Sequence, residues 1–168
     1  DLTLVYKKLL GSHQQLGELV EDRIYYGILT GATDVFVIDH ELRSNLIAQH
    51  PTSEEIIRPM LRGQDARPWY QFDSRMYLIC TQHGINIEQY PAIKRYLETY
   101  RAKLEPKPEN WDEKTQCKWG GRSSGKYEWY EWISPVDYFE EFSKPKIVWS
   151  DISKLPRFSW DSDGKLYS

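Results

Sequence analysis

The segment 58–69 holds the side chains best suited to directional hydrogen bonds. It contains three arginines beside Gln64 and Asp65, and its two prolines and one glycine predict a loop. Arg62, Gln64 and Arg67 carry planar groups that present several donors or acceptors at once, which favours recognition of flat polar partners. The alternative interpretation is structural, with Arg62 paired to Asp65 to hold the turn.

The segment 105–126 is the second candidate region. It is rich in proline and glycine and poor in aliphatic residues, which predicts a long loop, and such loops in compact domains usually carry function. Its basic and small polar side chains include Lys114, Lys118, Arg122, Ser123 and Lys126.

Charge is distributed unevenly along the 168 residues. The segment 58–126 has a net charge of +5, between the segments 1–57 at −5 and 127–168 at −3. A basic middle between acidic flanks can face phosphates, although scattered solvated charges would give the same count. The overall charge of −3 does not by itself indicate a polyanionic partner.

No pattern in the sequence supports catalysis or metal binding. There is no glycine-rich phosphate loop, no Gly-x-Ser-x-Gly elbow and no His-Glu-x-x-His. The four histidines lack metal-ligand spacing, and the two cysteines, Cys80 and Cys117, are too few for a disulfide framework or a zinc site. We therefore expect no catalytic, metal or cofactor site, and a cytoplasmic protein.

The elements that position these residues predict a single α+β domain, because helices and strands mix without regular βαβ alternation. Helices are expected at 2–9, at 39–47 with Asp39 as cap, at 52–57 from a capping box, at 91–104, and from Ser134-Pro135 onward. Strands are expected at 24–29, 35–38, 76–80, 146–149, 158–160 and 166–167. The first two should form a hairpin with Thr30 and Thr33 at its polar tip, and Asp161 and Asp163 should lie in another hairpin turn.

Several segments, in this order, resemble one known family. They are Ile28–Ile38 (an Ile-Leu-Thr-Gly hairpin), Ile57–Asp65 (Ile-Arg-Pro-Met-Leu-Arg-Gly-Gln-Asp), Tyr90-Pro91 with Leu97 and Leu104, Tyr127–Glu131, Lys144–Ile152 and Pro156–Phe158. Residues 12–168 are similar to the TaqI-like C-terminal target-recognition domain of adenine-specific DNA methyltransferases and type IIG restriction-modification enzymes. Residues 1–11 would then end a connector helix from a missing N-terminal methyltransferase domain, an expectation that fits a first residue other than Met.

The resemblance implies a specificity domain that reads double-stranded DNA in bacterial or archaeal defence. The parent enzyme would bind S-adenosylmethionine and methylate adenine at N6. The methylase signature Asn/Asp-Pro-Pro-Tyr/Phe is missing from this sequence, so the chain alone should neither bind the cofactor nor methylate. The residues expected to contact DNA are Thr30, Thr33, Arg62, Gln64, Arg67, Lys114, Lys118, Arg122, Ser123 and Lys126.

Two other functions remain open. The aromatic residues, 14% of the chain, could build a carbohydrate-binding module on Trp69, Trp111, Trp119, Trp129 and Trp132. The chain could also be a protein-interaction domain of a bacterial defence system that does not read bases.

Overall fold

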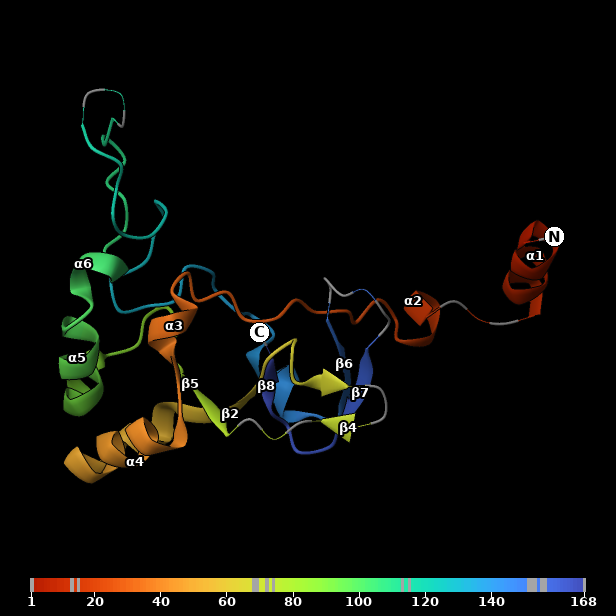
Figure 1. The fold of residues 1–168 in the computed structure, drawn as a ribbon, viewed down its shortest axis with the longest axis horizontal. Coiled ribbons are helices and arrows are strands. Elements are labelled where there is room, and N and C mark those ends of the chain that lie inside the picture. The colour runs from red at the N-terminus through yellow and green to blue at the C-terminus, as the bar shows by residue number, and fades with distance from the viewer. Residues whose placement is uncertain are drawn as a thin grey trace.

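A four-stranded sheet forms the centre of the computed structural model (Figure 1). Its strand order is β1 (Val37–Ile38), β5 (Met76–Ile79), β2 (Ile57–Leu61) and β8 (Leu166–Tyr167). The β1–β5 and β5–β2 pairs are antiparallel and the β2–β8 pair is parallel. The structure describes residues 2–12, 14, 16–67, 70–71, 73, 75–112, 114, 116–150, 154 and 157–167.

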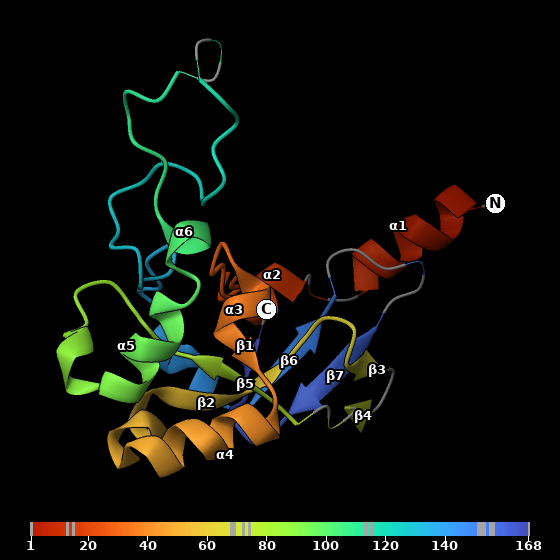
Figure 2. The same ribbon diagram turned by 60° about the vertical axis from the view of Figure 1, so that its left-hand side comes forward.

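Helices pack at one end of this sheet, as Figure 2 shows. They are α3 (Thr33–Phe36), α4 (His40–Gln49), α5 (Pro91–Glu98) and α6 (Arg101–Leu104), with the 3₁₀ helices η1 (Pro51–Ile56) and η2 (Ile87–Gln89). Asp39 caps α4, because its Oδ1 accepts a hydrogen bond from the Leu42 N–H at 2.8 Å. The core between these helices and the sheet contains Phe36, Ile79, Ile93 and Trp132, all fully buried.

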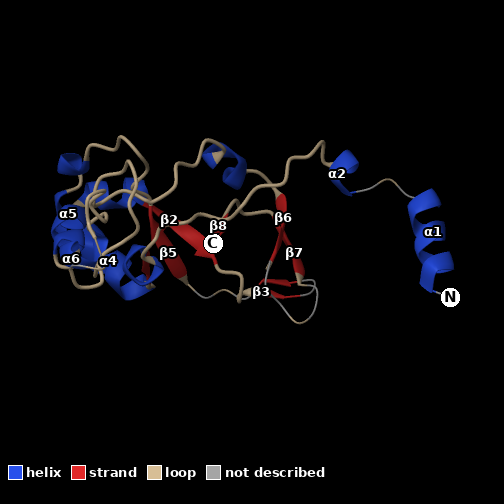
Figure 3. Ribbon diagram, turned by 90° about the horizontal axis from the view of Figure 1, so that it is seen from above, coloured by secondary structure: helices blue, strands red, loops and turns tan. Residues whose placement is uncertain are grey.

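Two small sheets lie on the other side of the central sheet (Figure 3). One pairs β3 (Ala66–Arg67) with β4 (Tyr70–Gln71), and the other pairs β6 (Lys146–Trp149) with β7 (Phe158–Asp161). The 3₁₀ helix η3 (Phe139–Ser143) precedes β6. In Figure 3, α1 (Leu2–Ser12) and α2 (Leu16–Leu19) lie beyond these sheets, away from the other helices.

The α+β class and most of the predicted elements are confirmed. Helices form at 2–12, 40–49 and 91–104, the last as α5 and α6, and a helical turn forms at 51–56. Strands form close to the expected bounds at 76–79, 146–149, 158–161 and 166–167. The capping box at 52–55 does not form, because the Thr52 hydroxyl donates instead to the Gln89 carbonyl at 2.9 Å.

The predicted hairpin at 24–38 is wrong. Residues 24–29 form no strand, and α3 occupies the start of the second predicted strand, so that only Val37 and Ile38 join the sheet. Gly31 permits this path because its φ is +75° and a side-chain carbon there would lie 2.4 Å from the Ile133 side chain. After Gly31 the chain therefore forms the helical turn α3, which buries Val35 and Phe36.

The predicted loop at 58–69 begins later than expected. Residues 57–61 are strand β2, and Pro59 fits within it because pairing with β8 starts only at Met60. The helix expected from Ser134 is also displaced, and the 3₁₀ helix η3 begins at Phe139. Trp69, Asp151, Ile152 and Pro156, which the sequence interpretation used, lie outside the described residues.

Candidate nucleic-acid interface

An arm, residues 106–121, extends from the helical end of the molecule in Figures 1 and 2. Its base is closed by a bridge between Pro106 and Arg122, in which the Lys107 N–H donates to the Arg122 carbonyl and the Arg122 N–H to the Glu105 carbonyl, both at 3.0 Å. The described residues of the arm form no helix or strand, so the predicted long loop is confirmed.

Two tryptophans stiffen the arm from within. The rings of Trp111 and Trp119 pack edge to face with centroids 4.7 Å apart. The indole N–H of Trp111 donates to the Cys117 carbonyl at 3.0 Å, and that of Trp119 to the Glu105 carbonyl at 3.2 Å. These contacts give the arm its own internal support.

Arg122 anchors the arm to the core and is not available to DNA. Its side chain is buried and donates to the carbonyls of Leu104 (2.7 Å), Thr30 (2.9 Å), Trp129 (2.8 Å) and Glu131 (2.6 Å). Its guanidinium also lies 4.6 Å from the centre of the Tyr127 ring. Burial lowers the pKa of Arg122 from its ordinary value. The expectation that Arg122 contacts bases is corrected here, because its donors are already used inside the protein.

Thr30 is also corrected. It is 2% exposed, and its hydroxyl accepts a hydrogen bond from the Ala32 N–H at 3.3 Å. Thr33, at the start of α3, is exposed, and its neighbour Asp34 forms an ion pair with Lys103 of α6. Of the two threonines, only Thr33 can reach a partner.

The remaining residues expected near the arm are on the surface. Lys114, Lys118, Ser123 and Lys126 are all exposed, although acidic side chains such as Asp112 stand among them. Because flexible exposed lysines suit contacts with phosphate oxygens, these four residues stay candidates for DNA contacts.

The turn 62–65 shows the structural arrangement that the sequence left open. The Asp65 carboxylate is buried and accepts from Arg62 Nε at 2.9 Å, from Nη2 at 3.2 Å and from the Arg62 backbone N–H at 3.1 Å. With its amide oxygen turned toward Arg62, Gln64 accepts from Nη1 at 3.1 Å. Arg67 Nη1 donates to the backbone carbonyls of Ala66, at 3.0 Å, and Gln64.

The predicted residues therefore fall into two groups and not one site. The turn 62–65 joins β2 to β3, close to β7, whereas the arm lies above α6, on the helical side of the central sheet in Figures 1 and 2. A partner that contacts both groups must extend from the helical side of the central sheet to the β6–β7 side, as a DNA duplex can.

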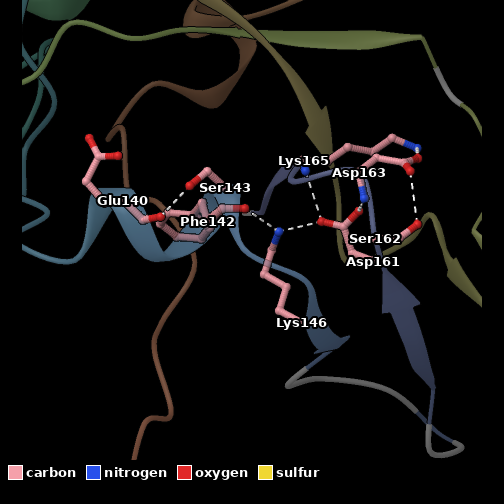
Figure 4. Close-up of polar contacts among 8 residues, drawn as sticks. All are labelled: Glu140, Phe142, Ser143, Lys146, Asp161, Ser162, Asp163 and Lys165. Atoms are coloured by element: carbon pink, nitrogen blue, oxygen red, sulfur yellow. Dashed lines mark hydrogen bonds and ion pairs between the residues drawn. The ribbon is translucent and has the colours of Figure 1, made fainter.

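A polar cluster missed by the sequence interpretation organises the end near β7 (Figure 4). The buried Asp161 carboxylate pairs with Lys146 Nζ and accepts from the backbone N–H groups of Lys165, at 2.9 Å, and Asp163, at 3.2 Å. Lys146 Nζ also donates to the Phe142 carbonyl at 2.6 Å. The predicted hairpin turn here is wrong, because β7 and β8 belong to different sheets.

Two hollows of about 350 and 670 Å³ flank residues 83–85. Arg58 and Glu55 line the first, and Lys126 and Glu131 are among the residues that line the second. The first hollow thus carries one charge of each sign and the second carries Lys126 with Glu128 and Glu131, so neither is a basic site for an anion. Cys80 lines the first hollow, where burial raises its pKa to about 12.

Four of the five tryptophans on which the carbohydrate alternative was based offer no open stacking surface, and the fifth, Trp69, lies outside the described residues. Trp129 and Trp132 are buried, and Trp111 and Trp119 pack against each other. Within the described ranges no three His, Cys, Asp or Glu residues gather as a metal site, and no helix there is long and apolar enough to span a membrane. No family model matches the chain, so the resemblance to the TaqI-like domain stays a prediction.

Proposed function

We propose that this chain is the sequence-specific DNA recognition domain of a restriction-modification enzyme whose parent carries an adenine-N6 methyltransferase domain. The observation that supports this best is the anchored arm. A buried arginine fixes its base, while Lys114 and Lys118 are exposed on it and Lys126 follows it. Residues 106–121 hold three lysines and three acidic residues, so these lysines would contact phosphates one by one and not as a basic patch.

The decisive experiment is a salt series on duplex binding. Fluorescence anisotropy measures the binding of a labelled duplex between about 50 and 200 mM salt. A plot of the logarithm of the binding constant against the logarithm of the salt concentration should have a steep negative slope. Each phosphate neutralised adds roughly −0.9 to that slope, so replacing Lys114, Lys118 and Lys126 with alanine should make it shallower by about 2.7.

A matched control removes the same charge elsewhere. Lys7, Lys94 and Lys144 are partly or fully exposed and lie outside both groups of predicted residues, so the triple alanine variant should keep the wild-type slope. Equal slopes for the two triple variants would contradict the role of the arm. Wild-type binding without salt dependence would favour the protein-interaction alternative.

Protection from trypsin gives an independent readout. Lys114 and Lys118 should be cut in the isolated chain and protected by duplex DNA, whereas buried Arg122 should resist in both conditions. Selection from a pool of randomised duplexes would then identify the recognised sequence. If the sequences of the bound duplexes stay random after selection, the chain does not recognise a specific DNA sequence.

A further inference from the structure

The outer face of the β6–β7 sheet is apolar and largely aromatic. Ile147 pairs with Trp160 and Trp149 with Phe158, so all four side chains point to the same side. Three of them are strongly exposed, Ile147 at 50%, Phe158 at 50% and Trp160 at 60%. We call these four residues the aromatic face.

The opposite face of the same sheet explains this unusual orientation. Val148 and Ser159 are buried there, and the Lys146–Asp161 ion pair lies on that side. The contacts in Figure 4 tie that pair to η3 and to the turn before β8. Because these bonds fix the sheet by its charged side, the aromatic face is held outward.

Two cations lie close to the aromatic face along the chain, and a third, Arg62, belongs to a turn beside the end of β6. The turn of Arg62 lies beside the end of β6, since a side-chain carbon at Gly63 would stand 3.3 Å from Ser150 Oγ. In the connection between β6 and β7, Lys154 is exposed and Arg157, directly before Phe158, is partly exposed. Exposed aromatic rings beside lysine and arginine are the combination that binds nucleobases by their faces and the backbone by its phosphates.

We propose that the aromatic face stacks on unpaired nucleobases, with Trp160 as the main platform and Arg157 and Lys154 near the adjoining phosphates. This inference rests on the proposed function, since it specifies how the same domain would bind DNA in which some bases are unpaired. The exposed Lys154 and the partly exposed Arg157, close to these rings along the chain, favour an anionic partner with flat apolar groups, such as a nucleic acid, over a purely apolar protein surface.

The test compares an intact duplex with the same duplex carrying a three-nucleotide single-stranded gap. Wild-type protein should bind the gapped DNA more tightly, and Trp160→Ala should weaken that binding by roughly 5- to 150-fold, the equivalent of one lost base–aromatic stack. Binding of the intact duplex should stay within about twofold of wild type. Tyr26→Ala, at an 81% exposed tyrosine that is not part of the aromatic face, is the matched control and should change neither affinity.

A direct readout of stacking is 2-aminopurine placed in the gap. Wild-type protein should quench its fluorescence, and Trp160→Ala should not, while far-UV circular dichroism confirms that the variant is folded. If Trp160→Ala weakened the binding of gapped and intact DNA equally, or changed the oligomeric state measured by sedimentation, the proposal would be overturned in favour of a protein interface. Salt-dependent binding of intact duplex without preference for the gap overturns this inference alone, whereas no binding of either DNA overturns the proposed function with it.

Discussion

Replacing Arg122 with alanine should destabilise the domain strongly. The side chain is buried, and four of its hydrogen bonds to carbonyl oxygens are 2.9 Å or shorter. Hydrogen bonds from a charged donor contribute about 1.5–3 kcal/mol each, so the four bonds set an upper range of roughly 6–12 kcal/mol. Water entering the vacated space would satisfy some of the carbonyls, and the cost of burying the charge would disappear. We therefore expect a net loss of about 4 kcal/mol, below that upper range.

Urea unfolding followed by far-UV circular dichroism measures this loss. With a slope of about 2 kcal/mol per molar urea, a change of about 4 kcal/mol lowers the midpoint by about 2 M. Arg122→Lys keeps the charge but has three donors on one nitrogen. Its urea midpoint should therefore lie between those of wild type and Arg122→Ala. Arg95→Ala, at an exposed arginine of α5, should stay within about 0.5 kcal/mol of wild type. An Arg122→Ala midpoint equal to that of Arg95→Ala would refute the anchoring role.

Four further results are expected. Asp65→Asn should cost more stability than Arg62→Ala, because Asp65 is buried and Arg62 partly exposed, and urea midpoints compare them; the reverse order would contradict this. Iodoacetamide at pH 8 should modify exposed Cys117 and spare Cys80 until the protein unfolds, as mass spectrometry would show. Burial raises the Cys80 pKa from 9.0 to about 12, so its stabilising contribution is present below pH 9 and declines as pH rises toward 12. Isothermal titration of S-adenosylmethionine should show no heat with this chain, and stoichiometric binding would overturn the proposed division between domains.

The elements that the sequence predicted well are those whose signals are local. The α5 helix begins with Pro91 and carries an apolar stripe that includes Ile93 and Leu97, and both of these side chains are buried. Asp39 caps α4 through a bond three residues along the chain. Such patterns need no knowledge of the rest of the fold.

The errors share a non-local cause. Val35 and Phe36 look like strand residues, but packing against the core and the turn at Gly31 place them in α3. Arg122 stands among small polar residues and looks exposed, yet its partners come from segments as distant as Thr30 and Leu104. In β7, the buried Asp161 reverses the usual rule that charged side chains face outward, so alternation alone could not say which face was exposed.

The turn at Arg62 shows how a structural contact and a recognition contact can coexist. Asp65 and Gln64 together engage four of the five N–H groups of the Arg62 guanidinium. Asp65 is buried and cannot leave without a large cost, whereas Gln64 is exposed and can turn away. A base that approaches this turn would therefore displace Gln64 and meet an arginine whose orientation Asp65 already fixes. Since that orientation removes rotamer freedom before binding, the ion pair that stabilises the turn also lowers the entropic cost of reading a base there.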